Sequence, residues 1–214
     1  MPAPSGNPGR GRTIPDPQKV FINCPFDDDY VATRDALVFA TVCCGFIPCS
    51  ALESGTVARP RIDRILDGLA GAKYSLHDLS RCRGEGDERL ARFNMPLELG
   101  IAMALRHQSA GRNHDWAVLV PEGHLYARFV SDLAGYDPLR YDGRPESAIP
   151  NVMRWLTTRP DALGTPVTPR DVRKILPDFY GHRRELEESW EGEVPWDRLI
   201  ERALTVARHG GLID

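Results

Sequence analysis

A single acid interrupts an apolar segment near the middle of the chain. Between Leu97 and Leu105 only Glu98 carries a polar side chain. An unpaired anion is costly to bury, so a carboxylate in such a segment needs a structural partner or a ligand. If the surrounding helix is buried on most sides, a cleft that binds a cationic ligand or a sugar would accommodate this charge.

A structural explanation competes with this hypothesis. Asn94 is a good N-cap residue and Pro96 is tolerated in a first helical turn. Glu98 would then fall near the end of that turn, where an acid complements the helix dipole and completes a capping box.

The composition restricts the classes of function. The chain has 214 residues and a net charge of −3, which gives no general attraction to nucleic acids or anionic membranes. No apolar run approaches the roughly 20 residues that span a bilayer, and the first residues lack the apolar centre of a signal peptide. We expect a cytoplasmic protein without membrane association or direct nucleic-acid binding.

The cysteine pattern predicts neither disulfides nor a metal site. The cysteines are odd in number and form no C-x-x-C pair: Cys24, Cys43, Cys44, Cys49 and Cys82. We expect reduced, buried thiols and no resident metal or cofactor. Because the sequence also lacks a P-loop and a G-x-G-x-x-G loop, a kinase or a Rossmann dehydrogenase has no support.

Strand and helix patterns alternate along the chain. Short apolar runs predict strands at 19–24, 46–53, 73–80, 115–121 and 138–142, and helices are expected at about 27–44, 61–72, 92–106, 125–135 and 147–158. This alternation predicts an α/β fold with a parallel five-stranded sheet and helices on both faces. The simplest order is the flavodoxin-like one, 2-1-3-4-5.

Four regions are expected. Residues 1–17 are rich in proline and glycine and predict a disordered leader. The α/β domain covers 18–158 and a linker covers 159–166. Residues 167–214 form a helical appendage, expected to pack on the main domain or on a second subunit.

Open parallel sheets bind ligands beyond the carboxyl ends of their strands, where the strand order reverses. Here that point lies between the first and third strands. The segments that leave those strands are polar or aromatic: NCPFDDDY, HDLSR and the loop into RFNMPLELG. We therefore expect the ligand site at this edge.

These residues also carry a resemblance. KVFINCPFDDDY, SLHDLSR and RFNMPLELGIA together resemble the TIR-like branch of the nucleoside 2-deoxyribosyltransferase and TIR superfamily, over roughly residues 19–157. The likeness is nearest to uncharacterised bacterial TIR-like proteins with FINCPF and FNMP-ELG strings. The family has a flavodoxin-like fold, and its catalytic glutamate often lies in an E-L-G context after the third strand. Here that context is Glu98–Leu99–Gly100.

The resemblance implies cleavage of a nucleotide N-glycosidic bond. A carboxylate near the anomeric carbon stabilises an oxocarbenium-like state or attacks it, and Glu98 is the expected catalytic residue. The acid-serine-glycine-threonine stretch of the deoxyribosyltransferases is replaced by Arg92-Phe93-Asn94-Met95. Hydrolysis or cyclisation of NAD, as substrate, is therefore favoured over deoxyribose transfer. The family also implies a homo-oligomer and a role in bacterial defence.

Further residues are expected to bind the nucleotide or nucleoside, and each has a structural alternative. The candidates are Asn23, for a base or phosphate; Phe26 and Tyr30, for stacking; Asp78, for ribose or for tuning Glu98; Asn94, for the sugar; and Arg61 and Arg92, for phosphate. The alternatives are core or rim packing for the aromatics, a turn for Asp78, capping for Asn94 and solvation for the arginines. His77 is expected to fill the core.

Two other functions remain open. The same cleft could hold a ligand without turnover, as a nucleotide sensor or a TIR-like assembly module. A receiver-type phosphoacceptor is disfavoured, because Pro25 and Phe26 separate the first strand from Asp27, and the last strand is not followed by a lysine.

Overall fold

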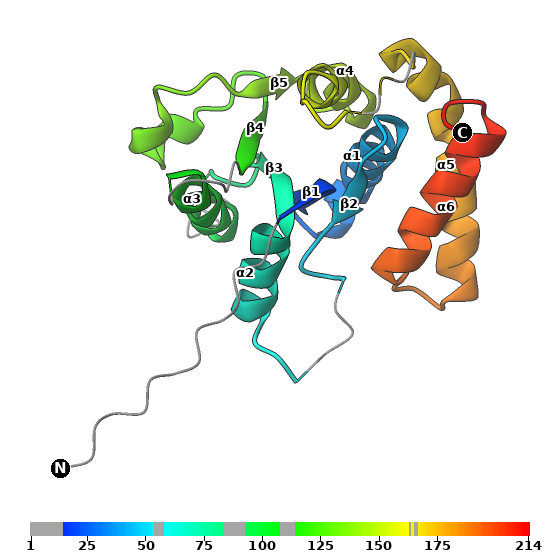
Figure 1. Cartoon of the computed structure of the whole chain (residues 1–214), viewed down its shortest axis with the longest axis horizontal. Helices are drawn as coiled ribbons and strands as arrows, with labels where there is room; N and C mark the ends of the chain where they lie inside the picture. The colour runs from blue at the N-terminus through cyan, green and yellow to red at the C-terminus, as the bar shows by residue number, and fades with distance from the viewer. Residues whose placement is uncertain (1–14, 54–57, 84–92, 108–113, 163, 165–166) are drawn as a thin grey trace.

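A computed structural model describes residues 15–53, 58–83, 93–107, 114–162, 164 and 167–214 (Figure 1). A parallel sheet of five strands forms its centre, in the order β2-β1-β3-β4-β5. The strands are β1 (Asp16–Asn23), β2 (Ile47–Cys49), β3 (Ala72–Asp78), β4 (Asp115–Pro121) and β5 (Leu139–Tyr141). The predicted α/β class and strand order are confirmed.

Helices cover both faces of the sheet. They are α1 (Val31–Cys43), α2 (Arg61–Gly71), α3 (Asn94–His107), α4 (Pro145–Thr157), α5 (Pro169–Ser189) and α6 (Trp196–His209). Alternating side chains of β1 separate the two faces. Val20 and Ile22 join the core with α1 and α4, whereas Phe21 packs with α2 and α3. Gly68 of α2 permits this close packing, because a Cβ there would lie 2.6 Å from the Phe21 ring.

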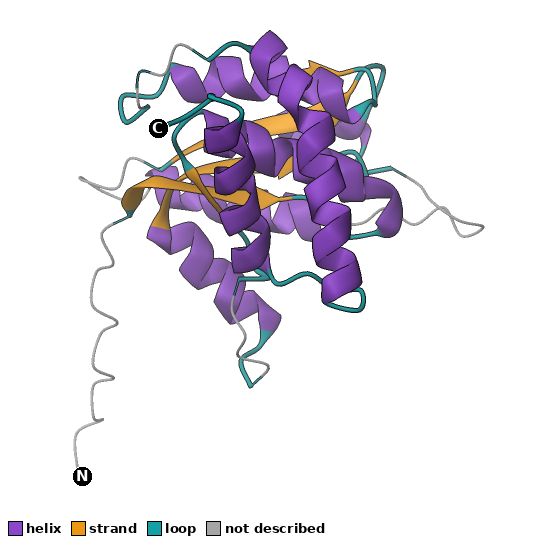
Figure 2. Cartoon of the chain, turned by 90° about the vertical axis from the view of Figure 1, so that its right-hand side faces the viewer, coloured by secondary structure: helices purple, strands orange, loops and turns teal. Residues whose placement is uncertain are grey.

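The helices α5 and α6 form a hairpin that packs on the outer side of α1 (Figures 1 and 2). The rings of Phe39 in α1 and Phe179 in α5 stack with their centroids 4.9 Å apart. Trp196 Nε1 donates to the Pro48 carbonyl at 3.1 Å. The hairpin and the sheet thus enclose α1, which explains why that helix is apolar on nearly all sides.

Some predicted boundaries differ from the structure. Asp16 and Pro17 belong to β1, although they were assigned to the leader, and residues 1–14 lie outside the described part. The strand predicted at 46–53 shortens to β2, an edge strand that accommodates Pro48. Of the linker, Asp161 is anchored to the sheet, since its carbonyl accepts from Gln18 Nε2 at 3.1 Å.

The prediction of a helix at 125–135 is wrong. Two separate 3₁₀ turns occupy this segment, Tyr126–Arg128 and Ser131–Leu133. Only Tyr126 and Leu133 are buried in these turns, so a continuous helix would have no apolar face to bury. The Tyr126 hydroxyl donates to the Leu133 carbonyl at 3.3 Å and fixes the two turns together.

Candidate functional site

The carboxyl ends of β1 and β3 meet at the centre of the sheet, where Asn23 pairs in register with His77. Five groups gather there from segments far apart in sequence. They are Asn23 at the end of β1, Phe26 after it, Asp78 at the end of β3, Arg61 at the start of α2 and Glu98 in α3. The candidate site is built from the elements that the sequence predicted.

Glu98 is buried and lacks a structural partner. It is 4% exposed, and within the described residues no hydrogen bond or ion pair engages its carboxylate. Burial raises its pKa to about 7, and the positive charge of Arg61 opposes this shift. A carboxylate in this state is close to the balance between its charged and neutral forms at neutral pH.

The helix-capping explanation of Glu98 is not supported. Leu97 N donates to the Phe93 carbonyl at 3.0 Å, and Asn94 is the first residue of α3 rather than the N-cap. Glu98 consequently lies beyond the first turn, where its carboxylate cannot reach the free amides of the helix end. Asn94 itself is exposed, and Arg92 lies outside the described residues.

Arg61 is near enough to Glu98 for its charge to act on the carboxyl, and it also contacts Phe26. The guanidinium of Arg61 is 5.5 Å from the centroid of the Phe26 ring. Phe26 is half-buried and Arg61 is exposed, so both are accessible to a ligand. The structure therefore brings an accessible aromatic ring and a cation together with Glu98.

Asn23 faces inward and is fixed by a chain of hydrogen bonds. Its Nδ2 donates to the Met95 carbonyl at 3.1 Å and lies 2.9 Å from His77 Nδ1. An amide nitrogen only donates, so His77 Nδ1 accepts and its Nε2–H donates to Ser75 Oγ at 2.8 Å. The Ser75 hydroxyl then donates to His114 Nε2 at 2.8 Å.

This chain links the first turn of α3 to the sheet, because Met95 is the second residue of that helix. Burial lowers the pKa of His77 to about 3, so the ring stays neutral. The interior position predicted for His77 is observed, and its ring also fixes the orientation of Asn23. With 2% exposure, Asn23 supports the site rather than offering its amide to a ligand.

Asp78 is completely buried, yet its carboxylate is well partnered. It accepts from the Ser80 amide at 2.8 Å and from the Tyr141 hydroxyl at 3.4 Å. Burial raises its pKa, and the hydrogen bonds oppose this shift. Tyr30, at 4% exposure, lies beside it in the core. These positions favour the structural alternatives, a turn for Asp78 and core packing for Tyr30.

The sequence interpretation missed a contact that joins the loops after β1 and β3. Arg81 Nη2 lies 2.6 Å from Asp27 Oδ1, across the edge where the ligand is expected. Opposite charges in two loops at the same sheet edge were the available signal. The pair links the two loops that flank the site.

Neither a metal site nor a membrane span is found in the described residues. Their His, Cys, Asp and Glu side chains form no group of three that could hold an ion. None of their helices has the length and apolar character needed to cross a bilayer. All the cysteines are buried and none forms a disulfide, and burial raises the pKa of Cys44 to about 12, so this thiol stays protonated.

Comparisons with protein-family models, with curated proteins and with solved structures found no match. The functional interpretation therefore depends on the geometry of the site.

Proposed function

We propose that this protein cleaves the N-glycosidic bond of a nucleotide, with NAD as the leading substrate, by hydrolysis or cyclisation. The observation that carries the proposal is Glu98, a buried carboxylate without a partner among the described residues, at the edge where β1 and β3 end. Its ionised form would stabilise the oxocarbenium-like state at the ribose carbon or attack that carbon.

NAD suits a site whose proposed acid is Glu98 alone. Its nicotinamide is bound through a positively charged ring nitrogen and leaves as a neutral molecule, so the departure needs no general acid. A purine base, by contrast, leaves more easily once it is protonated. Asp78 is fully buried behind its own hydrogen bonds, and it is not available to protonate such a base.

Phe26 and Arg61 would hold the substrate beside Glu98. The Phe26 ring offers a face for a base or sugar, and the Arg61 guanidinium offers two-point binding to phosphate. Protonation of Glu98 would remove its negative charge. Both catalysis and binding of the cationic nicotinamide ring would then be weaker.

The test is whether the full chain releases nicotinamide from NAD. The amount of free nicotinamide is measured by chromatography. Glu98→Gln and Glu98→Ala should abolish release, whereas Glu122→Gln, at an exposed acid after β4, should retain it. The assay is repeated at high protein concentration, because homo-oligomerisation is part of the proposal. Release that persists in both Glu98 variants would remove this residue from the mechanism.

The alternative is a nucleotide sensor or assembly module that uses the same carboxylate to bind the cationic ring. NAD binding by calorimetry, without release at any protein concentration, would support the sensor and contradict the enzyme.

A further inference from the structure

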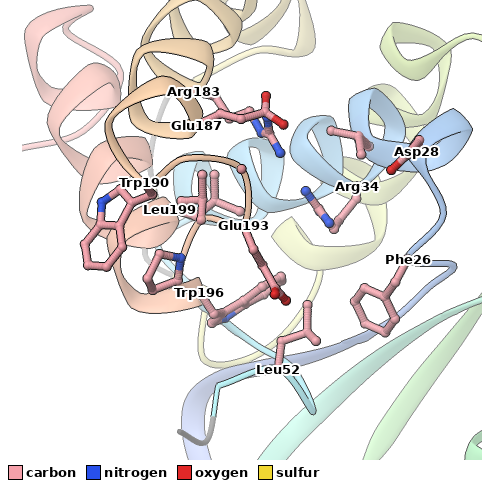
Figure 3. Close-up of a pocket in the computed structure, with 14 residues that line it drawn as sticks. Phe26, Asp28, Arg34, Leu52, Arg183, Glu187, Trp190, Glu193, Trp196 and Leu199 are labelled. Atoms are coloured by element: carbon pink, nitrogen blue, oxygen red, sulfur yellow. The ribbon is translucent and has the colours of Figure 1, made fainter.

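A cavity lies next to the candidate site, between the α5–α6 hairpin and the start of α1 (Figure 3). Its volume is about 720 Å³, within the range of small-molecule sites. Phe26 and Leu52, from the loops after β1 and β2, form one side. Trp196 and Glu193, from the hairpin, form the other.

The walls of this cavity are held in place by buried contacts. Arg183 Nε lies 3.1 Å from Asp35 Oδ2, and that carboxylate is 1% exposed. The Trp196 indole donates to the Pro48 carbonyl at 3.1 Å. The turn between the helices uses positive φ angles at Glu191 and Gly192, which direct the chain back toward α1. The cavity is therefore part of the folded structure.

The cavity and the Glu98 site share one residue. Phe26 lines the cavity and also carries Arg61 over its ring at 5.5 Å. Arg34 lines the cavity as well. Its charge and that of Glu98 both act on the pKa of the buried Cys24, so both side chains lie near this cysteine. Phe26 thus connects the cavity, which Arg34 also lines, with Arg61 of the candidate site.

The polar groups in the cavity match a 5′-nucleotide. Arg34 contacts Asp35 only through Nε and Nη2, at 3.4 and 3.3 Å, which leaves Nη1 without a partner among the described residues. Glu193 extends between Leu52 and Trp196, and no ion pair holds it in the described part of the chain (Figure 3). An arginine binds phosphate, a carboxylate accepts from ribose hydroxyls, and aromatic walls suit a base.

We propose that this cavity binds the adenosine monophosphate half of a dinucleotide, while the other half reaches Glu98. The inference rests on the proposed function for the identity of the whole substrate. It assigns the C-terminal hairpin a direct part in substrate binding. The diphosphate would cross the edge of Phe26 between Arg34 and Arg61.

Calorimetry with AMP tests this assignment in the full chain carrying Glu98→Gln. Nicotinamide mononucleotide is titrated into the full chain that retains Glu98, because that carboxylate is proposed to bind its cationic ring. Leu52→Trp fills the cavity from a side chain that is 41% exposed, and Glu193→Ala removes the ribose acceptor. Both should weaken AMP binding at least about tenfold and leave mononucleotide binding unchanged. The matched control is Ile47→Trp, at the other end of β2 and 44% exposed, which should change neither.

AMP binding that is unaffected by either cavity variant, or absent at millimolar AMP, would overturn the assignment. In that case the nicotinamide-release assay still decides the proposed function by itself. Conversely, cavity-dependent AMP binding in a protein that never releases nicotinamide would retain the nucleotide site and contradict the N-glycosidase.

Discussion

Two buried carboxyl groups of this protein occupy contrasting surroundings, one at the end of β3 and the other in α3. Asp78 accepts hydrogen bonds from the Ser80 amide and the Tyr141 hydroxyl. Glu98 has no such partner among the described residues, although it is 4% exposed. Both carboxyls raise the pKa of the buried Cys24 thiol, so both lie near it. A partnered buried acid stabilises a fold, whereas an unpartnered one is expected where a ligand completes its surroundings.

Substitution of Glu98 and of Asp78 should give the largest effects, on the rate in the first case and on stability in the second. Glu98→Gln should lower kcat for nicotinamide release by about 10³-fold and leave the fold intact. Asp78→Ala should leave activity per folded molecule within about tenfold, but lower the free energy of unfolding by about 2 kcal/mol because the Ser80 amide loses its acceptor. Rates and urea unfolding measure the two effects. A larger rate loss for Asp78→Ala, after correction for folded protein, would reverse the assignment.

A third buried acid extends the comparison to the hairpin. Arg183→Met would remove one of the two arginine partners of the Asp35 carboxylate, which is 1% exposed, and leave its contact with Arg34 at 3.3 Å. We expect the free energy of unfolding to fall by about 2 kcal/mol in urea titration at pH 8, since the buried charge keeps only this longer contact. Arg198→Met, at an exposed pair with Glu201, should change it by under about 0.5 kcal/mol. Equal effects would show that Asp35 does not depend on Arg183.

The pH dependence of stability should reveal the strain at Glu98. Its pKa is raised to about 7 in the folded protein, so protonation stabilises the fold and this contribution is lost as pH rises through 7. Glu98→Gln should therefore be more stable than the native chain at pH 8, by on the order of 2 kcal/mol. The difference should vanish near pH 4, below the ordinary pKa of a glutamate. A variant less stable at pH 8 would indicate an unrecognised partner.

The same ionisation should control the rate. Because the ionised carboxylate is the active form, kcat/KM should fall about tenfold for each pH unit below 7 and level off above it. Arg61→Gln removes the charge that lowers the pKa of Glu98, so the midpoint should move to higher pH. A profile that is flat between pH 5 and 8 would contradict the role of Glu98.

Sequence patterns predicted the sheet because apolar runs with helical segments between them leave few arrangements. They failed at 125–135, where the apparent helical stripe has only Tyr126 and Leu133 to bury. They also placed Tyr30 and Asp78 among ligand-binding candidates. Position at a strand end does not reveal whether a side chain turns into the core, and here both do.

The sequence by itself determined the order of the elements, and it predicted a site at the edge where β1 and β3 end. The order and the edge follow from local periodicity and from the geometry of parallel sheets, which bring the carboxyl ends of these strands together. The prediction of Glu98 as the acid of this site came from its place in an apolar segment and from a family resemblance. Only the tertiary structure decided that Glu98 lies beyond the first turn of α3 and that the hairpin adds a cavity beside Phe26. The burial of a side chain and its hydrogen-bond partners depend on residues distant in the chain, so a local sequence pattern cannot predict them.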